Sequence, residues 1–427
     1  MMLTPSQAEA IRAEGNVLVM AGAGTGKTRT LVERCLYRLL NPEPRRRVSI
    51  DRVLIVTFTE AAATEIRHRI RERLEEECRA DRGNSHLAEQ LALVDTTAIS
   101  TLHSFCWRLI RQHFFELDLD PRATVLTAEQ SSLLAERALD AIWEECYGAR
   151  DARTRALEQF VQDQARGRDD SIRDLVLRLH EYTQTLKNPA GWLDVQHRRL
   201  AQSSPGHWKG WLLDAVQTLR SRWLPLLAAI DHPVCVASAR ILESIHGNAK
   251  VVEMATALDA ILEADKDWPR GTKTRVRPRV ERFFDDAGFL ASLATGESGH
   301  DPLEEDWAWS RPHLFTLLEL TERFAARFEA AKRDAGALDF HDLEQGALRL
   351  LLDRNTGTPG TVAQHWIEQF DLVFVDEYQD INEAQDAILA ALSRSGDQAN
   401  RFLVGDLKQS IYRFRLANPG IFRGYLA

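Results

Sequence analysis

Short apolar runs stand near both ends of the chain, and residues with helical spacing follow them. The runs are three to six residues long and rich in Val, Ile and Leu, which is typical of buried strands. After the first run, Leu31, Cys35 and Leu39 recur at the spacing of one helix face. This alternation predicts an α/β fold whose parallel sheet is assembled from two separated segments. The predicted strands are Val17–Met20, Val53–Val56, Thr96–Thr101, Leu372–Val375 and Phe402–Val404.

The long middle of the chain has no strand pattern, and charged residues at helical spacing dominate it. We therefore predict three parts: residues 1–112, an inserted helical domain over 113–335, and residues 336–427, with the first and last sharing one sheet. Eight of the ten tryptophans lie in the middle part; they indicate helix packing, with stacking on nucleic-acid bases as the alternative. The basic stretch Trp268–Arg279 either follows a phosphate backbone or is a solvated loop between helices.

Composition narrows the class of protein. The chain has 54 Lys and Arg against 63 Asp and Glu, a net charge of −9, so a nucleic-acid contact requires locally gathered basic residues. The five cysteines are scattered and form no C-x-x-C pair, which argues against a disulfide framework and a zinc site. We expect a cytoplasmic protein, because the sequence has no leader pattern and no run long enough to span a bilayer.

A glycine-rich turn follows the first predicted strand. The segment Ala21–Thr28 fits the phosphate-binding P-loop, in which backbone N–H groups and a helix N-terminus cradle the phosphates of a nucleotide. Lys27 would reach the β- and γ-phosphates, and Thr28 would offer its hydroxyl to Mg²⁺. The first glycine of the usual motif is replaced by Ala21. The residues that keep the turn possible are Gly22, Gly24 and Gly26.

Two carboxylates follow the strand Leu372–Val375. Because the carboxyl ends of parallel strands meet at one edge of a sheet, Asp376 and Glu377 should lie where the P-loop presents its lysine. Asp376 can hold Mg²⁺, and Glu377 can orient and deprotonate the attacking water. Together with the P-loop, this pair predicts hydrolysis of a nucleoside triphosphate. We expect the next helix to begin at Tyr378.

Four other side chains leave two roles open when each is taken alone. Gln7 lies in the predicted helix Leu3–Ile11 and is either a surface residue or a reader of a base edge. His103 is either a structural hydrogen-bonding residue or a catalyst, although no Ser/His/Asp set is apparent around it. Gln409 follows the last strand and is either a loop residue or a sensor of the γ-phosphate. Phe414 is either a core aromatic or a stacking platform for a base.

The order of these motifs resembles the N-terminal ATP-binding part of superfamily 1 DNA helicases of the UvrD/RecB type. The resemblance implies a RecA-like P-loop NTPase sheet with a large inserted helical domain. Alanine often begins the P-loop of that family, which accounts for Ala21. The six matching blocks are Leu3–Ile11, Ala21–Thr28, Thr57-Phe58-Thr59, Ile99–Cys106, Asp376–Asp380 and Val404–Arg415.

The resemblance also assigns roles, residue by residue, with ATP and Mg²⁺ as cofactors. The implied catalytic and coupling residues are Lys27, Glu377 and Gln409, and the implied Mg²⁺ ligands are Thr28 and Asp376. The implied ATP-binding residues are Gln7, Ala21, Gly22, Ala23, Gly24, Thr25, Gly26, Lys27, Thr28 and Arg29. The implied DNA-binding residues are Phe58, Thr59, His103, Tyr412, Phe414 and Arg415.

Within this superfamily the chain is similar to the AddA branch of helicase–nucleases, with the RecB branch next. The long interval between Lys27 and Asp376 carries this likeness, together with the segments Leu338-Asp339-Phe340 and Lys408–Ala417. Glu60 departs from the asparagine of many relatives, which weakens the expectation of a DNA contact there.

The likeness to AddA implies a 3′–5′ DNA helicase or translocase of double-strand-break and recombinational repair. It also implies binding of single-stranded DNA or duplex ends, an AddB-like partner and no membrane. Because the sequence stops soon after the last block, we expect an N-terminal portion without the second RecA-like and nuclease domains. The alternative is a nucleotide- and DNA-binding module that does not unwind by itself.

Overall fold

The computed structural model describes residues 3–22, 24–43, 46–246, 250–294, 301–353, 356–409 and 416–425. It divides into two compact units, each with its own core. The first unit comprises Met1–Glu145, Arg173–Trp192 and Thr321–Ala427, and the second comprises Cys146–Ile172 and Leu193–Leu320. Among the described helices, none is both long enough and apolar enough to cross a lipid bilayer.

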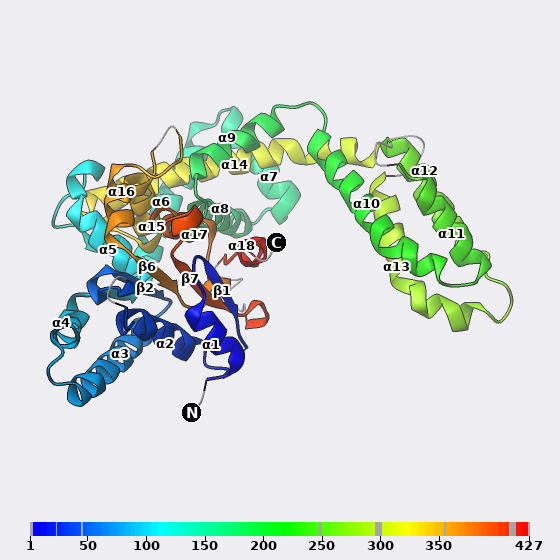
Figure 1. The fold of residues 1–427 in the computed structure, drawn as a ribbon. Coiled ribbons are helices and arrows are strands. Elements are labelled where there is room, and N and C mark those ends of the chain that lie inside the picture. The colour runs from blue at the N-terminus through cyan, green and yellow to red at the C-terminus, as the bar shows by residue number, and fades with distance from the viewer. Residues whose placement is uncertain are drawn as a thin grey trace. The chain divides into compact units, whose positions relative to one another are not determined.

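The first unit is built on a parallel sheet whose strand order is β1-β7-β6-β2-β3 in the described part of the chain (Figure 1). The sheet joins strands from both ends of the sequence: β1 lies beside β7, and β2 lies between β6 and β3. The predicted α/β fold with a parallel sheet is therefore confirmed. The strands are β1 (Val17–Met20), β2 (Val53–Thr57), β3 (Ala98–Thr101), β6 (Leu372–Val375) and β7 (Arg401–Gly405).

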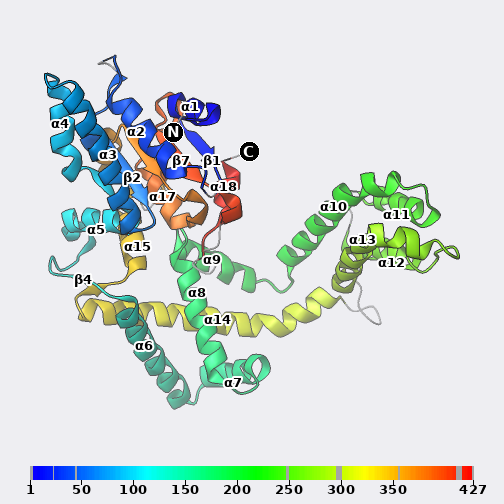
Figure 2. The same ribbon diagram turned by 90° about the horizontal axis from the view of Figure 1, so that it is seen from below.

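Helices cover both faces of this sheet, which is why its central strands are largely apolar. Along β2, Val53 and Ile55 face one core, whereas Leu54 and Val56 face the other. Figure 2 shows α2 and α3 side by side along one face. The helices of that face are α2 (Lys27–Leu39), α3 (Glu60–Ala80) and α4 (Ser85–Leu93). Those of the other are α5 (Leu102–Gln112), α15 (Phe340–Leu351), α16 (Thr361–Gln369) and α17 (Glu383–Ala391).

Three local expectations need correction. The strand predicted from Thr96 begins only at Ala98, because the 3₁₀ helix η3 (Val94–Thr96) precedes it. The middle of the chain is not wholly helical: β4 (Thr124–Val125) pairs in parallel with β5 (Ala337–Leu338). The helix expected from Tyr378 begins at Glu383, after a 3₁₀ helix η6 (Tyr378–Asp380).

Further helices belong wholly or partly to the first unit. The helix α1 (Pro5–Arg12) starts as its sequence predicts, with Thr4 as N-cap and a capping box formed with Gln7. The others are α6 (Ala128–Ala149), α8 (Asp169–Gln184), α14 (Pro302–Asp334) and α18 (Pro419–Gly424).

The second unit is helical, and four of its helices, α10 to α13, pack around one apolar core (Figure 1). Trp223 is buried there against Phe283, with ring centroids 5.8 Å apart. The packing role of the tryptophans is therefore observed for this residue, whereas Trp211 and Trp309 remain more than half exposed. The helices are α7 (Ala152–Ala165), α9 (Pro189–Leu200), α10 (Gly206–Ala228), α11 (Pro233–Ser244), α12 (Val251–Ala264) and α13 (Lys273–Ala294).

The basic stretch is not a loop throughout, because α13 begins at Lys273. Arg277 pairs with Asp265 at 3.0 Å and with Glu281 at 3.1 Å, so its charge is satisfied within the unit. The exposed basic residues of the stretch are Arg270, Lys273, Arg275 and Arg279.

Candidate nucleotide site and adjoining cavity

The turn between β1 and α2 has the backbone that a phosphate loop requires. Gly24 and Gly26 have φ angles of 73° and 86°, in the left-handed region that favours glycine. Ala21 lies outside that region, so a side chain is tolerated there, and its N–H donates to the carbonyl of Gly405 at 3.1 Å. The turn ends where Lys27 opens α2, whose N-terminus favours an anion.

Gln7 braces this turn from α1. Its Nε2 donates to the carbonyl oxygen of Thr25 at 2.9 Å, and its Oε1 accepts from the Thr4 N–H at 2.9 Å. Both ends of the amide are thus engaged, and the side chain holds the loop rather than lying free on the surface. Reading of the adenine base by Gln7 stays a prediction.

The structure brings the predicted lysine and carboxylates together across almost the whole chain. Lys27 Nζ lies 2.5 Å from Glu377 Oε2, although the two residues are 350 positions apart. The lysine side chain is only 8% exposed, and its Nζ also lies 3.4 Å from Gln409 Oε1. Beside it, Thr28 Oγ1 donates to Asp376 Oδ2 at 3.2 Å. Sequence reasoning placed all five side chains at one sheet edge, and they meet there.

Asp376 follows the fully buried strand β6 and is itself 4% exposed. Burial, with the negative charge of Glu377 as the next cause, raises its pKa above the ordinary carboxyl value. A divalent cation would offset both effects, and a hydroxyl beside a carboxylate is a donor pair that suits Mg²⁺. Thr28 and Asp376 therefore fit the predicted metal. The described residues contain no cluster of three His, Cys, Asp or Glu side chains that could hold an ion without water or phosphate ligands.

A second layer of polar contacts supports Glu377, and the sequence did not reveal it. Glu377 has a φ of 54°, and its Oε2 accepts from Gln379 Nε2 at 2.8 Å. Gln379 Oε1 in turn accepts from the Asp406 N–H at 2.8 Å, and the Asp406 carboxylate accepts from Gln409 Nε2. Both residues lie inside recognised blocks, Gln379 in Asp376–Asp380 and Asp406 in Val404–Arg415, and that position was the available signal.

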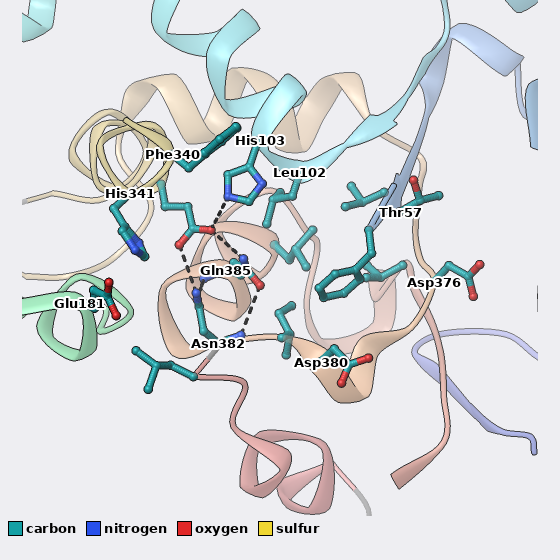
Figure 3. Close-up of a pocket in the computed structure, with 17 residues that line it drawn as sticks. Thr57, Leu102, His103, Glu181, Phe340, His341, Asp376, Asp380, Asn382 and Gln385 are labelled. Carbon is teal, nitrogen blue, oxygen red and sulfur yellow. Dashed lines mark hydrogen bonds and ion pairs between the residues drawn. The ribbon is translucent and has the colours of Figure 1, made fainter. Parts of the chain in front are cut away.

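A cavity of about 500 Å³ opens at the same sheet edge (Figure 3). Phe58 and His103, two of the predicted DNA-binding residues, line it together with Phe340 and Asp376. Phe58 and Phe340 are 36% and 47% exposed, so aromatic surface faces solvent there. Thr59 lies beside this cavity as the N-cap of α3, its hydroxyl accepting from the Ala62 N–H at 3.1 Å.

Glu60 is the first residue of α3, and its carboxylate is engaged internally. Its Oε1 accepts from Ser104 Oγ at 2.6 Å and from Thr101 Oγ1 at 2.9 Å, and the Ser104 bond chiefly lowers its pKa. Arg29 lies in the first turn of α2. The predicted site residues Ala23, Tyr412, Phe414 and Arg415 lie outside the described residues.

Comparison with known proteins identifies one helicase family and relatives within it. Residues 3–205 and 310–425 match the model of the UvrD/REP helicase N-terminal domain. The chain is 33% identical over 455 aligned residues to the AddA component of an ATP-dependent helicase/nuclease of Bacillus cereus (strain G9842). It is 34% identical to the protein of the same name from Bacillus thuringiensis subsp. konkukian (strain 97-27). In both cases the alignment covers 99% of this chain and 36% of the relative, so the chain spans about a third of their length.

Proposed function

The chain belongs to the UvrD/REP helicase family, and on this premise we propose that it is the ATP-binding part of a DNA helicase or translocase. Its relatives of the AddA helicase/nuclease type favour a role in double-strand-break and recombinational repair, on single-stranded DNA or duplex ends. Translocation would run 3′ to 5′, with an AddB-like partner. Residues 1–112 and 336–427 would form one RecA-like domain, with 113–335 inserted.

The observation that carries this proposal is the Lys27–Glu377 ion pair beside the Thr28–Asp376 hydrogen bond. A γ-phosphate is a stronger partner for the lysine than a carboxylate, because it presents more charge and more acceptor oxygens. Arriving ATP would therefore take Lys27 from Glu377 and leave that carboxylate free to accept a proton from water. Mg²⁺, held by Thr28 and Asp376, supplies charge neutralisation at the phosphates when it is bound.

Coupling to DNA would start from the same contacts. Gln409 contacts Lys27 through its side-chain oxygen and Asp406 through its side-chain nitrogen. A change of partner at Lys27 would therefore alter the contacts of the segment that follows β7. Phe58 and His103 would meet DNA in the cavity, with Thr59 at its border. The remaining proposed DNA contacts are Tyr412, Phe414 and Arg415.

The decisive experiment is Glu377→Gln, assayed by binding of a fluorescent ATP analogue and by phosphate release with and without single-stranded DNA. Removing the internal anionic partner of Lys27 should leave nucleotide binding intact or tighter. Loss of the general base should lower DNA-stimulated turnover by about 10²–10⁴-fold. Asp397→Asn is the matched control, because Asp397 is an exposed carboxylate in a 3₁₀ helix (Gly396–Gln398) away from the described site.

The outcomes separate the two candidate functions. Unchanged turnover in Glu377→Gln would contradict the assignment of the base. If the wild-type chain binds nucleotide and DNA without measurable turnover, the nucleotide- and DNA-binding module is favoured instead of a helicase that acts alone.

A further inference from the structure

Glu344 is a buried carboxylate that the proposed reaction does not use. It lies on α15 and is 1% exposed. Its Oε1 accepts from Gln385 Nε2 at 2.6 Å and lies 2.9 Å from His103 Nε2, while its Oε2 accepts from Asn382 Nδ2 at 3.1 Å. Figure 3 shows His103, from α5, facing Asn382 and Gln385, which both belong to the start of α17. A buried charge that is held so completely fixes the groups around it.

Two of these donors form the N-terminal cap of α17. Asn382 Oδ1 accepts from the Gln385 N–H at 2.8 Å, and Gln385 Oε1 accepts from the Asn382 N–H at 3.3 Å, a reciprocal capping box. Each side-chain amide therefore uses its oxygen to accept in the cap and its nitrogen to donate to Glu344. The positive end of the helix dipole adds to the stabilisation of the carboxylate. As a result Glu344 cannot turn away from His103 without losing the hydrogen bonds from Asn382 and Gln385.

The protonation of Glu344 determines what His103 can do. Burial alone would raise the Glu344 pKa, but the hydrogen bonds from His103 and Gln385, with the charge on His103, outweigh it and leave the pKa below the ordinary value. Glu344 is thus a carboxylate and can only accept. His103 Nε2 must then carry a hydrogen, and Nδ1 is the ring nitrogen left for a ligand. The ring is further fixed edge-on against Phe340, with centroids 5.2 Å apart.

We propose that Glu344 is a positioning residue for DNA binding: it fixes the ring orientation of His103 and holds a hydrogen on Nε2, so that the doubly protonated ring presents Nδ1–H to the phosphate oxygens of DNA in the cavity. This inference rests on the proposed contact of His103 with DNA. It also ties His103 to the proposed nucleotide site, because only the 3₁₀ helix Tyr378–Asp380 and Ile381 separate Asp376 and Glu377 from the Asn382 cap. A carboxylate that orients a functional imidazole is a recurrent arrangement in protein sites.

The test is a double-mutant cycle on the full chain with His103→Ala, Glu344→Gln and the double variant. Binding of a fluorescein-labelled sixteen-residue oligo(dT) is followed by anisotropy at fixed salt. Each single variant should weaken DNA binding by about tenfold, the size expected for a hydrogen bond to a charged group. The double variant should be no weaker than His103→Ala, because Glu344 acts through that ring. Binding of the ATP analogue should not change.

Glu181→Gln is the matched control. Glu181 lines the same cavity but is exposed on α8, so its neutralisation removes the same charge without disturbing the cap. It should bind DNA as well as wild type or more tightly. A weakening equal to that of Glu344→Gln would show that cavity charge alone matters and would overturn the inference.

The remaining outcomes distinguish this inference from the function on which it rests. If His103→Ala binds DNA normally, the proposed DNA contact is wrong and the role of Glu344 falls with it. If His103→Ala weakens binding but Glu344→Gln does not, or if the two losses add, only the positioning role is wrong. Should Glu344→Gln not fold, ¹⁵N-histidine NMR of the wild type decides, with His103→Ala to assign the signal. We expect a protonated Nε2, and an unprotonated Nε2 would overturn the proposal.

Discussion

Gly405 is the position where a single methyl group should disturb both packing and chemistry. It ends β7, and a Cβ added there would lie 2.6 Å from Gln379 Oε1, 2.7 Å from Phe422 Cε2 and 3.2 Å from the Gln379 backbone nitrogen. Real Cβ atoms essentially never come within 3.0 Å of another heavy atom, so something must move. Phe422 is 0% exposed, which leaves its ring little room to yield.

The size of the effect follows from what surrounds the new methyl group. Forcing one carbon into a packed interior costs typically about 1–3 kcal/mol. Gln379 cannot swing away freely, because its Oε1 accepts from the Asp406 N–H and its Nε2 donates to Glu377. We therefore expect Gly405→Ala to lower the free energy of unfolding by about 2 kcal/mol and to shift the Glu377 carboxylate. DNA-stimulated ATP turnover should fall more than the folded fraction does.

The assay pairs urea unfolding, followed by far-ultraviolet circular dichroism, with phosphate release in the absence of urea. Gly83→Ala is the control, since a Cβ at that exposed turn meets nothing within 4 Å and φ is not positive. It should be neutral in both measurements. If Gly405→Ala unfolds at the wild-type midpoint with wild-type turnover, the argument from close approach is refuted.

Two further predictions concern pH. Burial, and then the charge of Lys332, lowers the pKa of His180 from 6.5 to about 4. Between these two pH values the unfolded chain binds one more proton than the folded chain, so the free energy of unfolding falls by about 3 kcal/mol as the pH drops from 6.5 to 4. In urea titrations at several pH values, His180→Phe should remove this pH dependence of stability. Asp371 accepts hydrogen bonds from Arg52 at 2.7 Å and from Arg394 at 2.9 Å. Burial raises the pKa of Asp371, but these bonds outweigh burial and leave the pKa below the ordinary carboxyl value. The contribution of Asp371 to stability is present above the ordinary carboxyl pKa and is lost as the pH falls through the lowered pKa. Asp371→Asn should therefore lower the free energy of unfolding at pH 7 by about 1–3 kcal/mol and weaken the loss of stability in acid.

The sequence predicted the sheet and the side chains that gather in the candidate nucleotide site because their signals are local. A glycine turn before Lys27, and a buried strand before Asp376, each specify a backbone shape and a side chain within a few residues. The rule that parallel strands share a carboxyl edge then brings the two together without any knowledge of the 350 positions that separate Lys27 from Glu377. At this edge of the sheet, prediction and structure agree.

The features that were missed depend on contacts between distant segments. The pairing of Thr124–Val125 with Ala337–Leu338 involves two residues on each side, too few for a periodic signal. Glu344 is held by donors from α5 and from the cap of α17, and no local sequence pattern relates these segments. One signal did exist: Glu344 stands on the apolar side of α15, among Leu343, Ala347 and Leu348, where a charge requires a partner.

The candidate nucleotide site and the cavity are linked by one short segment of the chain, and this bears on how the two could be coupled. Asp376 bonds to Thr28 and also lines the cavity, and Asn382, six residues later, caps α17 against Glu344. Between them lies the 3₁₀ helix of Tyr378–Asp380, whose residues are buried rather than free to absorb a shift. A change of partner at Glu377 would therefore be transmitted to the His103 side of the cavity through about six residues of packed backbone. This segment is the shortest covalent route by which the candidate nucleotide site and the cavity could be coupled.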